Sequence, residues 1–185
     1  MGQLDRKQVA YIRICFPFIT VAHMSENIEQ DKVPDGWSAD LSVGVDIIDE
    51  DHQAFFRLAG LLRDVIEGPE EGNDYLIETA INVLEEYVEG HFLREEMAMA
   101  AVNYPYLAEH LAAHEAFAAK AHQIAQDYRN GNKDIAATMS GLVERWLVGH
   151  IQTIDKQYSG YLTNDNVDSR PLIYLSDEDG NELEV

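Results

Sequence analysis

The chain has 185 residues, a length that suits one domain with its own hydrophobic core. Hydrophobic residues make up 46% and charged residues 25%, which is ordinary for a globular protein, but the net charge is −21. This negative charge argues against nucleic acid as a partner, because a phosphate backbone is bound through clusters of Lys and Arg. No apolar run is long enough to span a bilayer, so no contact with a membrane is expected.

The first 36 residues are expected to form an N-terminal extension. Their apolar run "RICFPFITVAH" follows Arg6 and Lys7, which is the order of a secretory signal. However, Arg13 intrudes on the apolar region, and the end of the run resembles an A-x-A cleavage site poorly. A flexible extension, or a natural start at Met24, is therefore favoured over export. The single cysteine, Cys15, cannot form an intrachain disulfide, and we expect a cytoplasmic protein.

From Asp46 onward, apolar residues recur at three- and four-residue steps in four stretches, as on one face of an α-helix. Turn-forming sequence separates the stretches, and Pro105 is placed to open the third helix because proline is tolerated in a first turn. No strand pattern competes, so we predict an all-α fold, an antiparallel up-down four-helix bundle. The four apolar stripes are Ile48, His52, Phe55, Ala59, Leu62 and Ile66; Ile77, Ala80, Leu84, Val88, His91 and Glu95; Leu107, His110, His114, Phe117 and Ile124; and Met139, Val143, Trp146, Leu147, His150, Ile154 and Tyr158.

Histidines occupy positions in all four apolar stripes. A single histidine on an apolar face is usually a core residue with one hydrogen-bond partner. Several buried imidazoles, together with carboxylates, need partners for all their polar atoms, and a metal centre supplies those partners at once. His110 and His114 could also be a chance surface pair, but they align with Leu107 and Phe117. The histidines in the stripes are His52, His91, His110, His114 and His150.

Helical spacing selects the residues that can share a metal ion. Residues four apart on an α-helix are offset by only about 40°, so His110 and His114 can point at the same ion. His91 and Glu95 have the same relation. Glu96 is offset by about 140° from His91 and is expected to face water.

Asp155 is harder to place from spacing. It follows His150 by five residues, which fits a regular α-helix poorly. Either the centre is wide enough to take ligands from both edges of the stripe, or the helix contains a π-bulge. A solvated carboxylate is the alternative that spacing leaves open.

The types of ligand narrow the choice of metal. Imidazole and carboxylate without thiolate suit iron, zinc, copper or manganese. Seven ligands are too many for one tetrahedral zinc and suit two near-octahedral ions bridged by carboxylates. The H-E-x-x-H motif of zinc proteases and the Glu-x-x-His motifs of ferritin-like di-iron bundles are both absent from the sequence. The candidate site contains more histidine than the sites of those di-iron bundles, which favours binding of a ligand over catalysis of an oxidation.

Four segments, "WSADLSVGVDIIDEDH", "HFLREE", "YPYLAEHLAAHEAF" and "WLVGHIQTID", occur in this order along the chain. Together they resemble the hemerythrins of the bacterial single-domain type, over roughly Trp37 to Tyr161. The elements His-x3-Glu, His-x3-His and His-x4-Asp are individually weak, but combined with the leading Asp-x2-His they are highly specific. The resemblance implies a non-haem centre of two Fe ions bridged by an oxo or hydroxo group. It implies as metal ligands His52, His91, Glu95, His110, His114, His150 and Asp155.

The resemblance also implies how these ligands are divided. His110, His114 and His150 would hold one iron, whereas the two remaining histidines, His52 and His91, would hold the other and leave it an open position. Glu95 and Asp155 would bridge the two ions.

The function that this implies is reversible O2 binding, as an oxygen carrier, store or sensor, without a catalysed reaction. Two alternatives remain. One is a di-iron enzyme that handles peroxide or nitric oxide, and the other is an O2-responsive signalling module that acts in trans.

We therefore divide the chain into an N-terminal extension (1–36), a di-iron four-helix bundle (37–163) and an acidic C-terminal tail (164–185). The tail is expected to be loose, although "PLIYL" (171–175) could dock on the bundle. The tail is also the candidate contact for an unidentified protein partner. The sequence does not indicate an oligomeric state.

Overall fold

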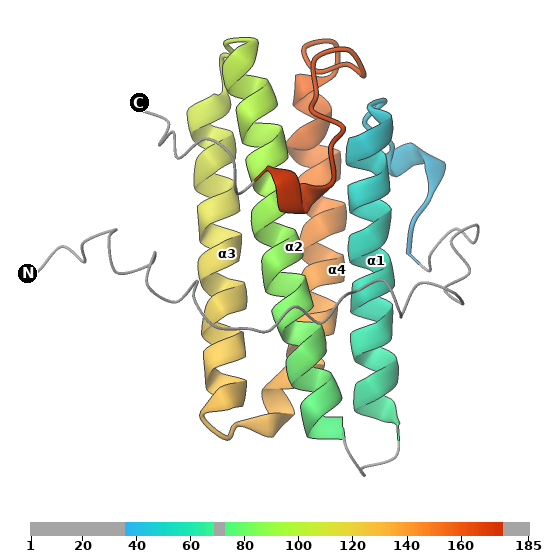
Figure 1. Cartoon of the computed structure of the whole chain (residues 1–185), viewed down its shortest axis with the longest axis vertical. Helices are drawn as coiled ribbons and strands as arrows, with labels where there is room; N and C mark the ends of the chain where they lie inside the picture. Colours follow the sequence, from blue (N-terminus) through green and yellow to red (C-terminus); the bar gives the residue numbers. More distant parts are fainter. Residues whose placement is uncertain (1–35, 69–72, 176–185) are drawn as a thin grey trace, which may run out of the picture. The chain divides into compact units, whose positions relative to one another are not determined.

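The structure, a computed structural model, describes residues 36–68 and 73–175. It contains the four long helices α1 (Asp46–Glu67), α2 (Asn73–Ala101), α3 (Leu107–Arg129) and α4 (Ala136–Thr153). Successive helices run in opposite directions (Figure 1), and both α1 and α3 pack against α2 and α4. The prediction of an all-α, up-down four-helix bundle is confirmed.

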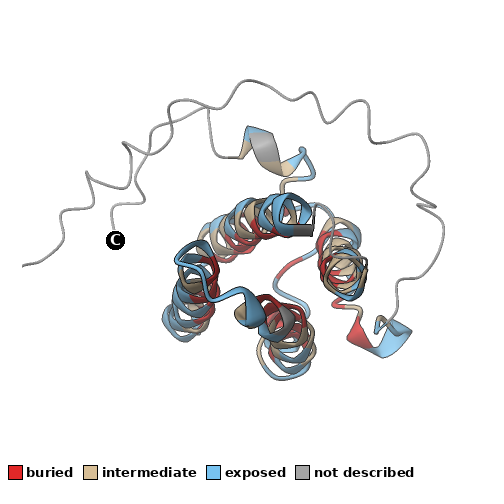
Figure 2. Cartoon of the chain, turned by 90° about the horizontal axis from the view of Figure 1, so that it is seen from below, coloured by how far each residue is buried: buried red, intermediate tan, exposed pale blue. Residues whose placement is uncertain are grey.

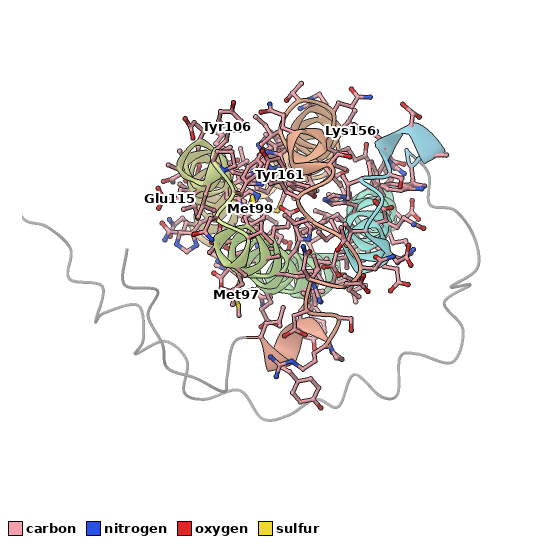
Figure 3. All side chains as sticks on the ribbon, turned by 90° about the horizontal axis from the view of Figure 1, so that it is seen from above. Met97, Met99, Tyr106, Glu115, Lys156 and Tyr161 are labelled. Atoms are coloured by element: carbon pink, nitrogen blue, oxygen red, sulfur yellow. The ribbon has the colours of Figure 1, made fainter. Side chains whose placement is uncertain are left out.

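The core lies between the inward faces of the four helices, where the buried residues gather (Figure 2). Helical periodicity produces this separation, because side chains three or four positions apart share a face. α2 shows it within one turn, where Met99 is fully buried and Met97 is 39% exposed. Figure 3 shows Met99 between the helices and Met97 on the outer side of α2.

Two helix ends differ from the prediction. α3 begins at Leu107 and not at Pro105, which lies in the connecting turn. α2 ends there in a Schellman motif: Asn103 has a φ of +52°, and the amide of Tyr104 donates to the carbonyl of Met99. α4 ends at Thr153, and a short 3-10 helix, η5 (Asp155–Tyr158), follows where a continuous helix was expected.

The described residues contain three further 3-10 turns, η3 (Ala39–Leu41), η4 (Lys133–Ile135) and η6 (Leu172–Tyr174). η6 packs on α2 (Figure 1), so the prediction that residues 171–175 could dock on the bundle is confirmed. Val167 is also buried, and the expectation of a loose tail is therefore wrong for residues 164–175. Residues 1–35 and 176–185, including the start at Met24, lie outside the described residues. None of the described helices is both long and apolar enough to cross a membrane.

Candidate metal centre

All of the predicted ligand side chains lie in the interior of the bundle, each no more than 5% exposed. α1 contributes one histidine, α4 contributes another, and α3 contributes the pair separated by one turn. α2 contributes a histidine and a glutamate, and η5 contributes the aspartate. The set is His52, His91, Glu95, His110, His114, His150 and Asp155.

Three histidines gather at one end of this cluster. The Nε2 atoms of His110 and His114 are 3.1 Å apart, and each lies 3.3 Å from Oε2 of Glu95. Nε2 of His150 lies 2.9 Å from Oδ1 of Asp155. One ligand atom from each of these five residues lies within 4.8 Å of the others, a group that could hold a metal ion.

The other end has only two histidines. His52, His91 and Glu95 form a second group that could hold an ion, so Glu95 belongs to both groups. Asp155 also faces both ends, because its Oδ1 lies 3.4 Å from Nε2 of His110 and its Oδ2 lies 3.4 Å from Nε2 of His52. The two carboxylates therefore stand between a three-histidine end and a two-histidine end.

The break after α4 places Asp155 in this cluster. Ile154, with φ −115° and ψ −60°, ends the α-helix, and the chain continues as η5. The amide of Ile154 still donates to the carbonyl of His150 at 2.7 Å. The end of the α-helix at Ile154, and neither a π-bulge nor a solvated carboxylate, brings Asp155 beside His150 despite the spacing of five residues.

The buried polar atoms test whether metal ions fit. Among the described residues, Nε2 of His52, Nε2 of His150 and both carboxylate oxygens of Asp155 have no hydrogen-bond partner, although they face one another across the centre. Buried polar atoms normally have partners, since leaving one unsatisfied costs roughly 1–3 kcal/mol. Metal ions would satisfy these four atoms together. The Nδ1 atoms of His52 and His110 also lack partners, and ions on the Nε2 side would not satisfy them.

The charges agree with cation binding. Burial raises the pKa of Asp155 well above its usual range, and the negative charge of Glu95 adds to the rise. Burial also acts to raise the pKa of Glu95, but the surrounding His91, His110 and His114 outweigh it and hold that pKa well below its usual range. Burial and the charge of Glu95 therefore disfavour the ionised form of Asp155, whereas bound cations would favour the ionised form of both carboxyls.

Three contacts outside the predicted set hold the ligand side chains in place. Nδ1 of His114 lies 2.9 Å from Oε1 of Glu96, so the expectation that Glu96 faces water is wrong. The hydroxyl of Tyr158 donates to Oε1 of Glu95 at 2.7 Å. Nδ1 of His91 lies 3.4 Å from Oδ2 of Asp51, a buried carboxylate. Partners of this kind orient a ligating imidazole and raise its basicity.

Aromatic rings surround the imidazoles. His114 stacks on Phe92 at 3.7 Å between ring centroids, and His150 stacks on Trp146 at 4.2 Å. A narrow apolar space beside the cluster has no room for a water molecule, and it is lined by Phe55, Phe117, Val143, Trp146 and Leu147. Apolar side chains therefore border the polar cluster on this side.

The fold and the cluster together define a metal-binding four-helix bundle with a buried histidine and carboxylate centre. Residues 43–162 match the family model described as "Hemerythrin HHE cation binding domain". The chain belongs to the hemerythrin family, in agreement with the resemblance in its sequence motifs.

Relatives of known name support the assignment. The chain is 30% identical over 122 residues to "Bacteriohemerythrin" of Pseudomonas paraeruginosa, covering 66% of this chain and 77% of that protein. It is 32% identical over 124 residues to "Hemerythrin subunit 2" of Golfingia vulgaris, covering 67% and 90%. A solved structure described as "Crystal structure of hemerythrin:wild-type" superposes with a TM-score of 0.63 at 28% identity, covering 68% of this chain and 95% of that one.

Proposed function

We propose that this protein binds O2 reversibly at a non-haem centre of two Fe ions. The observation that carries the proposal is the convergence of five buried imidazoles on two shared carboxylates, in a chain of the hemerythrin family. Two irons, when bound, supply reversible electron exchange with O2. The donor set suits them, because imidazole and carboxylate are good ligands for iron and no thiolate is present in the cluster.

For the ligands, we propose the set predicted from the sequence. His110, His114 and His150 would hold one ion, His52 and His91 would hold the other, and Glu95 and Asp155 would bridge them. The two-histidine end has fewer protein ligands, and this difference favours O2 binding at that end. The contacts of the two carboxylates with both ends support their bridging role.

The surrounding residues hold the donors and exclude water. Tyr158 fixes the orientation of Glu95 through its hydroxyl, and Glu96 does the same for His114 through Nδ1. The apolar side chains around the cluster, including Leu147, limit the access of water and protons to the centre. This protection favours reversible binding over turnover, so we propose a carrier, store or sensor and not an enzyme.

We further propose a cytoplasmic protein and keep the predicted division into an extension (1–36), a bundle (37–163) and a C-terminal tail (164–185). Any protein partner would act in trans.

The test is to mix the reduced, iron-loaded protein with O2 in a stopped-flow spectrophotometer. A charge-transfer band that forms with O2 and disappears when O2 is removed, over several cycles, is expected. Rapid loss of the band with formation of a product would favour the alternative, an enzyme for peroxide or nitric oxide. Elemental analysis should show two irons per chain, and one metal per chain would contradict the di-iron proposal.

A further inference from the structure

A buried arginine lies between the two-histidine end of the centre and the C-terminal segment. Arg94 is only 2% exposed and lies one turn after His91 on α2. Its Nε donates to Oδ2 of Asp51 at 2.8 Å. The same carboxylate oxygen lies 3.4 Å from Nδ1 of His91, so one atom of Asp51 contacts both side chains.

The other end of the guanidinium group binds the C-terminal segment. Nη2 of Arg94 donates to the carbonyl of Arg170 at 2.9 Å, and Nη1 donates to the carbonyl of Asp168. A buried charge is tolerated only when it is paired and hydrogen-bonded, and Arg94 obtains these partners from Asp51 and from the segment. The docked segment is therefore part of what keeps the Arg94–Asp51 pair in place.

The segment also packs on the same face of α2. A Cβ placed on Gly90 would lie 3.0 Å from the Cβ of Leu172, so this glycine, next to His91, permits the close approach of η6. The hydroxyl of Tyr87 donates to Oδ1 of Asp51 at 2.9 Å. The carboxylate of Asp51 thus contacts three side chains, those of Tyr87, Arg94 and His91.

We propose that Asp51 and Arg94 are positioning residues for His91, and that docking of residues 167–172 on Arg94 controls how tightly the two-histidine end holds its metal ion. This inference rests on the proposed function only in taking the centre to bind two irons. Loss of such an outer contact typically weakens metal binding by roughly 10- to 100-fold. Because such coupling is reciprocal, binding of a metal ion at the two-histidine end should favour docking of residues 167–172 by the same factor.

The first test measures release of iron from the reduced protein to an excess of Fe(II) chelator, without O2. Leu172→Asp should undock the segment, because it places a charge against Gly90. One iron per chain should then leave about tenfold faster or more, whereas the second should leave at the parental rate. Tyr174→Asp is the matched control, because it adds the same charge to η6 at a side chain that is 53% exposed. This control should release both irons as the parent does.

A second measurement needs no variant. Amide hydrogen exchange of residues 164–175 should slow when the metal-free parent is loaded with iron, because the linkage is reciprocal. Unchanged exchange would overturn the proposal, as would parental release of both irons from Leu172→Asp, or equal acceleration of both. A parent chain that does not hold two irons would instead refute the proposed function.

Discussion

The most informative substitution in the centre is His114→Ala. The imidazole of His114 is 1% exposed and stacks on Phe92, and its two nitrogens contact Glu95 and Glu96. The substitution removes one donor from the three-histidine end. The variant should therefore lose one iron per chain.

The expected loss in the free energy of unfolding follows from the same contacts. Glu95 is completely buried and would lose a partner, at roughly 1–3 kcal/mol. The carboxylate of Glu96 is 20% exposed, so water replaces part of its lost contact. With the lost ring packing, the metal-free variant should be less stable by about 2–4 kcal/mol. For a domain of this size, this lowers Tm by roughly 4–16 °C.

His122→Ala is the matched control. Its side chain is 61% exposed and contacts Glu85 on the surface, so stability should change by no more than about 0.5 kcal/mol. Iron content by elemental analysis and thermal melting of the metal-free proteins decide the outcome. Two variants with the same iron content and the same Tm would show that His114 is not a ligand.

Three further predictions concern the centre and the residues around it. Leu147→Asn places a polar group in the apolar space, so its oxygenated band should decay several-fold faster in air while iron content stays at two. If the band of the variant and that of the parent decayed at the same rate, Leu147 would serve only to pack the core. Tyr158→Phe removes the hydrogen bond to Glu95 and should lower the free energy of unfolding of the metal-free protein by about 1.5–3 kcal/mol in urea; an unchanged value would contradict this. Burial lowers the pKa of His114, but hydrogen bonds to Glu95 and Glu96 outweigh it and raise that pKa to about 9. A metal ion binds only the neutral imidazole, so the apparent affinity for iron should rise from pH 7 to about 9, and iron loading should release protons. An iron affinity that does not change with pH would refute this reasoning.

The same pKa shift predicts how metal-free stability depends on pH. The pKa of His114 is about 9 in the folded state and 6.5 for an ordinary histidine, as in the unfolded chain, so the folded state binds the extra proton between these values. The contribution of His114 to stability is therefore fully present below about pH 6.5 and is lost as the pH rises through about 9.

The amino-acid sequence was sufficient to predict the bundle and the inward side of each helix. Helical periodicity is a local property, since residues three and four apart share a face whatever the rest of the chain does. The pairs His110 with His114 and His91 with Glu95 could therefore be placed together before any packing was known.

Tertiary structure decided the contacts that no spacing describes. Asp155 joins the centre because the chain leaves the α-helix at Ile154, a change in backbone geometry that a periodic pattern does not reveal. Glu96 reaches His114 because α2 and α3 pack closely, although its position relative to His91 predicted exposure. Arg94 joins α1, α2 and the C-terminal segment, and its acceptors at 168 and 170 are backbone carbonyls, which carry no sequence signal. Periodicity assigns each side chain to a face of its own helix, but only packing determines which side chain of another element it meets.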